Sequence, residues 1–82
     1  MNVETLRRQY AAGDRDSSDA ELARANLIQA KFSSINLIRA DLSAAISPYA
    51  NLSGAFLILA NLERANLARA MAIAVNFSSA RF

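Results

Sequence analysis

Few side chains in this chain can do chemistry, because the sequence contains neither cysteine nor histidine. Their absence removes disulfides, thiolate ligands, the usual zinc sites and the commonest general base. Carboxylates remain, and one pair has a regular spacing: Glu21 and Asp41 lie twenty residues apart, and Asn61 and Arg81 continue the series. If the fold repeats every twenty residues, the two acids converge as a candidate metal or acid–base pair.

The same series also has a purely structural interpretation. Two carboxylates and one amide supply fewer oxygens than hard cations require. Arg24 and Arg64 would lie on the same side of such a fold, where they would relieve the repulsion between the acids. We therefore interpret the series as a solvated column, and we predict no catalytic, cofactor-binding or metal-binding residue and no enzymatic activity.

The elements that would position these groups follow from a five-residue repeat. From Ala20 onward every fifth residue is small or β-branched, and two residues later a large apolar side chain follows in all but two of thirteen units. The two exceptions are Ser47 and Ala72. The pattern is most regular from Ala60 to Ala70, where Ala-Asn-Leu-Glu-Arg is followed directly by Ala-Asn-Leu-Ala-Arg.

Neither a long helix nor a single strand explains this repeat. On a helix, a step of five residues turns the chain by about 500°, so successive leucines would lie ~140° apart and form no stripe. On a strand, an odd step moves each leucine to the opposite face. A path that bends once per unit brings every leucine back to one axis. The repeat therefore predicts an all-β solenoid in which the first and third positions of each unit face inward.

The recurring unit A-(N/D)-L-x-x, as in Ala25-Asn26-Leu27 and Ala40-Asp41-Leu42, resembles the pentapeptide-repeat family. The resemblance covers residues 15–82. It implies a right-handed, four-sided β-helix of about three coils, in which residues twenty apart stack on one another.

Residues 1–14 are predicted to form a short capping helix before the repeats. Asn2 is the expected N-cap, and Gly13 suits the C′ position. The segment 6–16 is similar to the opening of short cyanobacterial members of the family, although Ser17 stands where those proteins tend to have phenylalanine. We expect two parts, a cap helix over 1–14 and a repeat β-helix over 15–82.

Outward-facing apolar residues are the candidate binding surfaces, because contiguous apolar patches often mark contacts. With four-sided stacking, one side carries what we call the Phe56 patch. It consists of Ile38, Phe56, Ile58 and Leu59. The opposite side carries a second apolar group, made of Ile28, Ile46, Pro48 and Tyr49. We predict that the Phe56 patch binds a protein partner or a second copy of the chain.

The C-terminal end of the solenoid is a further candidate surface. An end that no coil covers exposes unpaired backbone groups and apolar side chains, which favours pairing with another chain. The expected contact residues are Leu62, Leu67, Phe77 and Phe82. We therefore predict a two-fold, end-to-end homodimer, an arrangement similar to known behaviour in the family.

Two other features were weighed as sites. Ser47 either lines a small pocket or is a packing irregularity between Leu27 and Leu67. The asparagines that recur at the second position, such as Asn26 and Asn61, are predicted to bond local backbone at the corners, as Asn does in turns. We therefore do not interpret the asparagines as a binding motif.

The leading functional hypothesis is a non-catalytic scaffold or protein-interaction module whose partner the sequence does not name. One alternative comes from the family, some of whose members resemble duplex DNA and bind DNA gyrase. That mimicry needs a negative surface, whereas residues 20–82 carry six basic and three acidic side chains. A second alternative is weak nucleic-acid binding, which we do not favour because the cations lie on different sides. They are Arg24, Lys31, Arg39, Arg64 and Arg69.

The sequence also sets an expectation for location. The longest apolar runs are far shorter than the ~20 residues that span a bilayer, and the first residues lack the pattern of a secretory signal. We therefore expect a cytoplasmic protein without a membrane partner.

Overall fold

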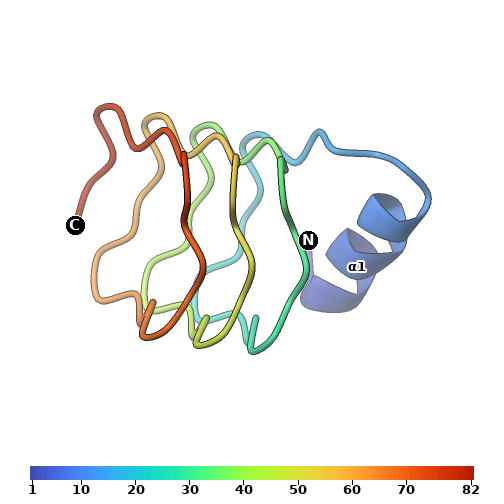
Figure 1. The fold of residues 1–82 in the computed structure, drawn as a ribbon, viewed down its shortest axis with the longest axis horizontal. Coiled ribbons are helices and arrows are strands. Elements are labelled where there is room, and N and C mark those ends of the chain that lie inside the picture. Colours follow the sequence, from blue (N-terminus) through green and yellow to red (C-terminus); the bar gives the residue numbers. More distant parts are fainter.

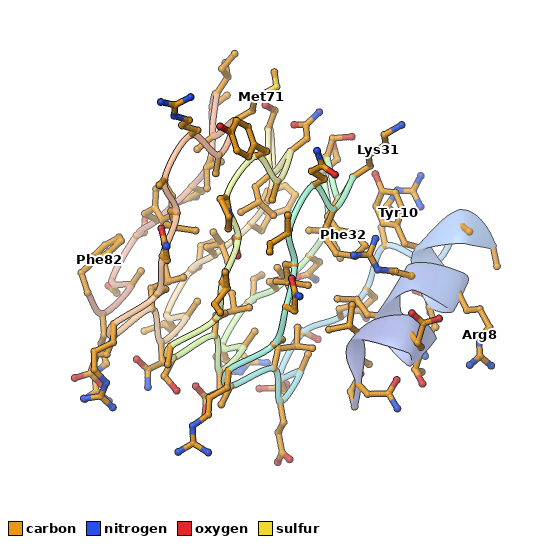
Figure 2. All side chains as sticks on the ribbon, turned by 90° about the horizontal axis from the view of Figure 1, so that it is seen from below. Arg8, Tyr10, Lys31, Phe32, Met71 and Phe82 are labelled. Carbon is orange, nitrogen blue, oxygen red and sulfur yellow. The ribbon has the colours of Figure 1, made fainter.

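The computed structural model describes all 82 residues, and its one regular element is the helix α1, Val3–Ala11. After α1 the chain winds in coils that stack side by side, with α1 at the N-terminal end of the stack and Phe82 at the other (Figures 1 and 2). The molecule measures 30 × 23 × 20 Å.

The coils are joined in a parallel register of twenty residues. Bridges run from Asp16 with Asn36 to Asn61 with Arg81, always between residues twenty apart. Because the repeat is five residues long, each coil contains four units, and one bridge residue lies on each side. This register is the one that the sequence predicted for Glu21 and Asp41, which form one of the bridges.

The sides of the coils are less strand-like than expected. The sequence predicted an extended segment over the first three positions of each unit, but the structure has isolated bridges and no continuous strand. The reason is length, because each side has room for only one paired residue before the next corner begins.

Each corner is a tight turn with one residue in the left-handed region. At a typical corner, the N–H of Ala25 donates to the carbonyl of Leu22 at 3.0 Å, and Arg24 between them has φ 62°. Twelve fifth-position residues other than glycine share this positive φ, and Gly54 has φ +73°. A left-handed residue that is not glycine costs roughly 1–2 kcal/mol, so stacking between coils must offset a strain repeated at every corner.

The core is a column of small and large side chains along the axis of the coils. Alanines at the first position and leucines at the third are buried, as predicted, and the central coil is the most completely enclosed. Leu57 has no exposed surface, because Leu37 and Phe77 lie at the same position in the coils on either side of it. Burial of each coil by its neighbours is how this short chain builds a core.

The helix α1 covers the N-terminal end of this column. Asn2 caps it, since its side-chain oxygen accepts from the N–H of Thr5 at 2.8 Å, and Gly13 follows the C-cap with φ +95°. Leu6 is fully buried in the core. Tyr10 ties the helix to the first coil, because its hydroxyl donates to the carbonyl of Ser33 at 2.6 Å.

The last coil is the least covered. Leu67 and Phe77 are half-buried, and Phe82 is 74% exposed. Leu62 differs from the expectation, because it is only 4% exposed: residues 81 and 82 stack on its unit, and its N–H donates to the carbonyl of Arg81 at 2.7 Å. The apolar end surface therefore contains Leu67, Phe77 and Phe82, with Leu62 beneath it.

This gradient of burial predicts unequal costs for the same mutation along the stack. Leu57→Ala should lower the free energy of unfolding by about 2–5 kcal/mol, because it opens a cavity between two coils. Leu67→Ala, at a half-buried position of the last coil, should cost clearly less. Urea unfolding followed by circular dichroism measures both free energies. Equal losses of stability would contradict the conclusion that each coil is buried by its neighbours.

Candidate interaction surfaces

The backbone hydrogen bonds of one unit explain most of the repeat's sequence. In the unit that begins at Ala40, the N–H of Ala40 closes the preceding corner, and those of Asp41, Leu42 and Ala44 bond neighbouring coils. The ladder leaves the N–H of the fourth residue, Ser43, without a backbone partner. Because backbone donors need acceptors, each unit requires one additional acceptor near its fourth position.

A side chain at the second position supplies that acceptor. The Oδ1 atom of Asn61 accepts from the N–H of Glu63 at 3.0 Å, and Asp41 accepts from the N–H of Ser43 at the same distance. The structural interpretation of the asparagines is thus confirmed. Eight second-position residues make this bond: Asp16, Asn26, Asn36, Asp41, Asn51, Asn61, Asn66 and Asn76.

The units that lack this acceptor are informative. Ile46 has none, but the fourth residue of its unit is Pro48, which has no N–H to satisfy. Four more units lack one, those of Glu21, Lys31, Phe56 and Met71, and the N–H groups of their fourth residues have no acceptor in the protein. At two of these four units, those of Phe56 and Met71, the chain exposes apolar side chains in place of the hydrogen bond.

The Phe56 patch is assembled as predicted. Ile38 and Ile58 occupy the same position in adjacent coils, and the N–H of Arg39 donates to the carbonyl of Ile58 at 2.9 Å. Phe56 is 46% exposed and Leu59 52%, whereas the two isoleucines are partly buried. The patch therefore combines an exposed aromatic ring and an exposed leucine with two partly buried isoleucines.

A hollow adjoins the Phe56 patch that the sequence did not predict. It has a volume of about 420 Å³ and is bounded by Phe56 and Ile38 on one side and Arg15 and Asp16 on the other. Arg15 is held here because its guanidinium lies over the ring of Tyr10, 3.6 Å from the centroid, and donates to the Tyr10 carbonyl. Sequence analysis missed the contribution of Arg15 and Asp16 because their unit, 15–19, matches the repeat poorly.

The second apolar group also forms on one side. Ile28, Ile46 and Tyr49 are exposed, and the N–H of Gln29 donates to the carbonyl of Pro48 at 3.1 Å, which fixes the stacking of the two coils. Sequence analysis missed Met71 and Ile73, which are exposed on the adjoining side. The missing second-position amide at Met71 was the signal that could have identified them.

The column of Glu21, Asp41, Asn61 and Arg81 forms as a stack, but its charges pair differently from the prediction. No cluster of three acidic groups suited to a metal exists anywhere in the chain. Arg24 and Arg64 make no ion pair with the column, which corrects the expectation that they relieve it. Arg81 instead contacts Glu63, with Nη2 and Oε1 2.9 Å apart.

Asp41 acts in this column as a backbone acceptor. The Ser43 hydroxyl donates to its carboxylate at 2.7 Å and the Ser43 N–H at 3.0 Å, and these bonds lower the pKa of Asp41. A carboxylate that is held ionised in this way is poorly suited to act as a general acid. The geometry therefore favours the structural interpretation of the column.

Ser47 is a packing irregularity. Its side chain is buried, and it lines none of the three hollows on the surface. The alternative interpretation, a small pocket at this position, has no counterpart in the structure.

Stacked coils built from five-residue units, with apolar groups on their outer sides, define a repeat protein of the structural or interaction type. A family model described as pentapeptide repeats matches residues 18–46 and 49–82 in eight copies, and the chain belongs to this family, whose repeats in general form β-helix solenoids. The match is interrupted at Ser47 and Pro48, where the unit departs from the repeat. No curated protein matches the chain. No helix in the structure has the length and apolar character needed to cross a membrane.

The acceptor role of the second position predicts the effect of restoring it. Phe56→Asn provides an acceptor for the N–H of Ile58, a hydrogen bond worth about 1 kcal/mol. We expect this variant to be more stable than Phe56→Ala by about that amount, although both remove the ring. Thermal unfolding of the two variants measures the difference, and equal midpoints would contradict the proposed use of the amide.

The lowered pKa of Asp41 predicts a sensitivity to acid. Because its pKa in the folded state lies below the ordinary value of 3.8, the carboxylate contributes stability above that pH, and the contribution is lost as pH falls through the lowered pKa. Asp16 and Asp19 act in the same direction, Asp16 through bonds from Ser18 and Asp19 through its bond with Arg39.

We expect Asp41→Asn to keep the bond to the Ser43 N–H while reducing the loss of stability in acid. Melting temperatures from pH 7 to pH 2.5 measure this effect. Glu21→Gln is the matched control, because the Glu21 carboxylate accepts no hydrogen bond. Parallel curves for Asp41→Asn and the parent protein would be the contrary result.

Proposed function

We propose that this protein is a non-catalytic scaffold that binds a protein partner through the Phe56 patch. The observation that carries the proposal is the exposed apolar surface at Phe56 and Leu59. The Phe56 unit is one of four that lack the hydrogen bond kept by eight others, and in place of the acceptor it presents a half-exposed ring. A change that costs local stability and exposes apolar surface is expected where that surface is used.

The framework supports a scaffolding role. We propose that the stacked coils form a right-handed, four-sided β-helix, which holds its outer side chains at a fixed spacing. The interior offers no cavity for a substrate, because alanine and leucine fill it. Rigid presentation of surface groups from a filled core is suited to binding, and we propose a cytoplasmic setting for it.

The alternative of DNA gyrase binding by DNA mimicry receives less support from the charges. The acidic side chains of the repeats number five and are confined to two adjacent sides, and two of them are ion-paired with arginines. A surface that mimics duplex DNA needs a continuous row of negative charge. We therefore rank protein binding through the Phe56 patch above this alternative.

The partner is sought by affinity capture from the source cell. The double variant Phe56→Asn/Leu59→Asn should lose the partner, because it removes the exposed apolar groups. Both substitutions suit their backbone, since asparagine supplies the missing acceptor at 56 and tolerates the φ of 61° at 59. Glu21→Asn is the matched control, because it also places asparagine at a second position that lacks the acceptor, and Glu21 lies outside the patch and outside the other exposed apolar groups.

Two results would refute the proposed role of the patch. One is capture of the same proteins by the parent and the double variant. The other is loss of capture by Glu21→Asn to the same extent, because the effect would then not be specific to the patch.

We further propose that the end surface of Leu67, Phe77 and Phe82, with Leu62 beneath it, pairs with a second copy of the chain. Phe77 and Phe82 lie against each other with centroids 5.6 Å apart, so they present one aromatic surface. Sedimentation at tens of micromolar should show a dimer that Phe82→Ser weakens and Phe56→Asn does not. A monomeric parent protein would disprove the end-to-end contact and leave the Phe56 patch untouched.

A further inference from the structure

Acidic side chains are absent from half of the coiled surface. The segments 24–34, 44–54 and 64–74 contain no aspartate or glutamate. Bridges stack these segments on one another, for example Asn26 on Ile46 and Lys31 on Asn51. Two adjacent sides of the coils are therefore free of negative side chains along the whole stack, while the other two sides hold all the acids of the repeats.

Two cations, Lys31 and Arg69, lie on these two sides, and neither makes an ion pair. Arg24 and Arg64 lie at the corner that ends the side of Glu21 and Asp41. The two ion pairs of the molecule, Arg39 with Asp19 and Arg81 with Glu63, lie on the acid-bearing sides. The acid-free sides therefore carry positive charge that is not paired with a carboxylate.

Two hollows adjoin at the corner between the acid-free sides. One, of about 340 Å³, lies between α1 and the first coil and is lined by Arg7, Tyr10 and Phe32. The other, of about 620 Å³, is lined by Tyr49, Asn51 and Met71. Gln29 and Lys31 line both hollows and stand between them. We call the two adjoining hollows the acid-free groove; its defining residues are Arg7, Tyr10, Gln29, Lys31, Tyr49 and Met71.

The walls of this groove combine positive charge with apolar surface. Figure 2 shows Tyr10, Lys31 and Met71 along one edge of the molecule, with Arg8 on α1 pointing away from the coils. Arg69 supports one wall, because its guanidinium donates to the Tyr49 hydroxyl at 3.1 Å. Beyond Met71, Ile73 is 69% exposed, and its N–H has no acceptor in the protein.

We propose that the acid-free groove binds an extended peptide in which acidic and large apolar residues alternate. Arg7, Lys31 and Arg69 would pair with its carboxylates, and the hollows beside Tyr10 and Met71 would receive its apolar side chains. The side chains of Gln29 and Asn51 line the hollow beside Met71, where the Gln29 amide can donate to and accept from a peptide backbone. Asn51 can donate through Nδ2, because its Oδ1 already accepts from the Ser53 N–H. This site is separate from the Phe56 patch and does not depend on it.

The geometry favours a peptide over two other anionic partners. A bilayer surface is flat and would contact one side of the coils, whereas residues from both sides of a corner line these two hollows. A nucleic acid strand needs a regular row of cations and stacking aromatics. Here the cations are irregularly placed, and Tyr10 is committed to holding the cap through Ser33.

The probe is a fluorescein-labelled eight-residue peptide that alternates glutamate with leucine and phenylalanine. The matched probe has lysine in place of each glutamate. Fluorescence anisotropy should show saturable binding of the acidic peptide to the full chain, weakened by added salt, and no binding of the lysine peptide. Lys31→Glu and Arg69→Glu should each weaken binding by about tenfold.

Arg8→Glu is the control for charge reversal, because it alters the net charge equally on the far side of α1. It should bind the acidic peptide as the parent does. Amide chemical shifts should change at Gln29, Lys31, Tyr49 and Met71 on titration with the peptide, and unchanged spectra of the variants without peptide confirm that they are folded.

Several outcomes would overturn the proposal. No binding of the acidic peptide, equal weakening by Arg8→Glu, or shift changes confined to the Phe56 patch would each do so. Phosphatidylserine vesicles and oligo-deoxythymidine serve as competing probes. Tighter binding of either one than of the peptide, with the same dependence on Lys31 and Arg69, would assign the groove to a membrane or to nucleic acid instead.

Discussion

The structure depends on satisfying one backbone donor per unit. The ladder between coils and the bond across each corner use four of the five N–H groups, and in eight units the second-position side chain accepts from the fifth. A chain without long strands has no other regular acceptor to offer, and an unsatisfied buried donor costs as much as a lost hydrogen bond. This requirement explains why Asn or Asp recurs at the second position of the repeat. It also identifies the units in which another residue stands at that position.

Much of this architecture could be predicted from the residues. Leucine at intervals of five excludes a helix and a strand. The four units per coil, and with them the register that stacks Asp41 on Glu21, came from the resemblance to pentapeptide repeats and not from the spacing. The cap was also predictable, because Asn2 and Gly13 are helix signals that act locally. The hand of the coil and the brevity of the paired sides were not derivable from spacing, since both depend on backbone angles at the corners.

Of the candidate surfaces, one could be predicted from the sequence and one could not. The Phe56 patch was predictable because its four residues are apolar at outward positions of stacked units. The acid-free groove was not, because it needs the placement of α1 against the first coil, which brings Arg7 and Tyr10 beside Lys31. Pairing of Arg81 with Glu63 was missed for a related reason: long side chains reach across units in ways that a repeat register does not fix.

The twenty-residue register has a consequence for how such a chain changes over time. Inserting one residue would rotate every later side chain out of the core, whereas inserting a whole unit of five advances all later residues by a quarter turn and leaves the core composition intact. A duplication such as the one visible from Ala60 to Ala70 therefore moves every surface group beyond it to the neighbouring side without disturbing the packing. The surface can therefore change while the interior stays the same. The number of units between the Phe56 patch and a later surface group determines the side of the coils on which that group lies.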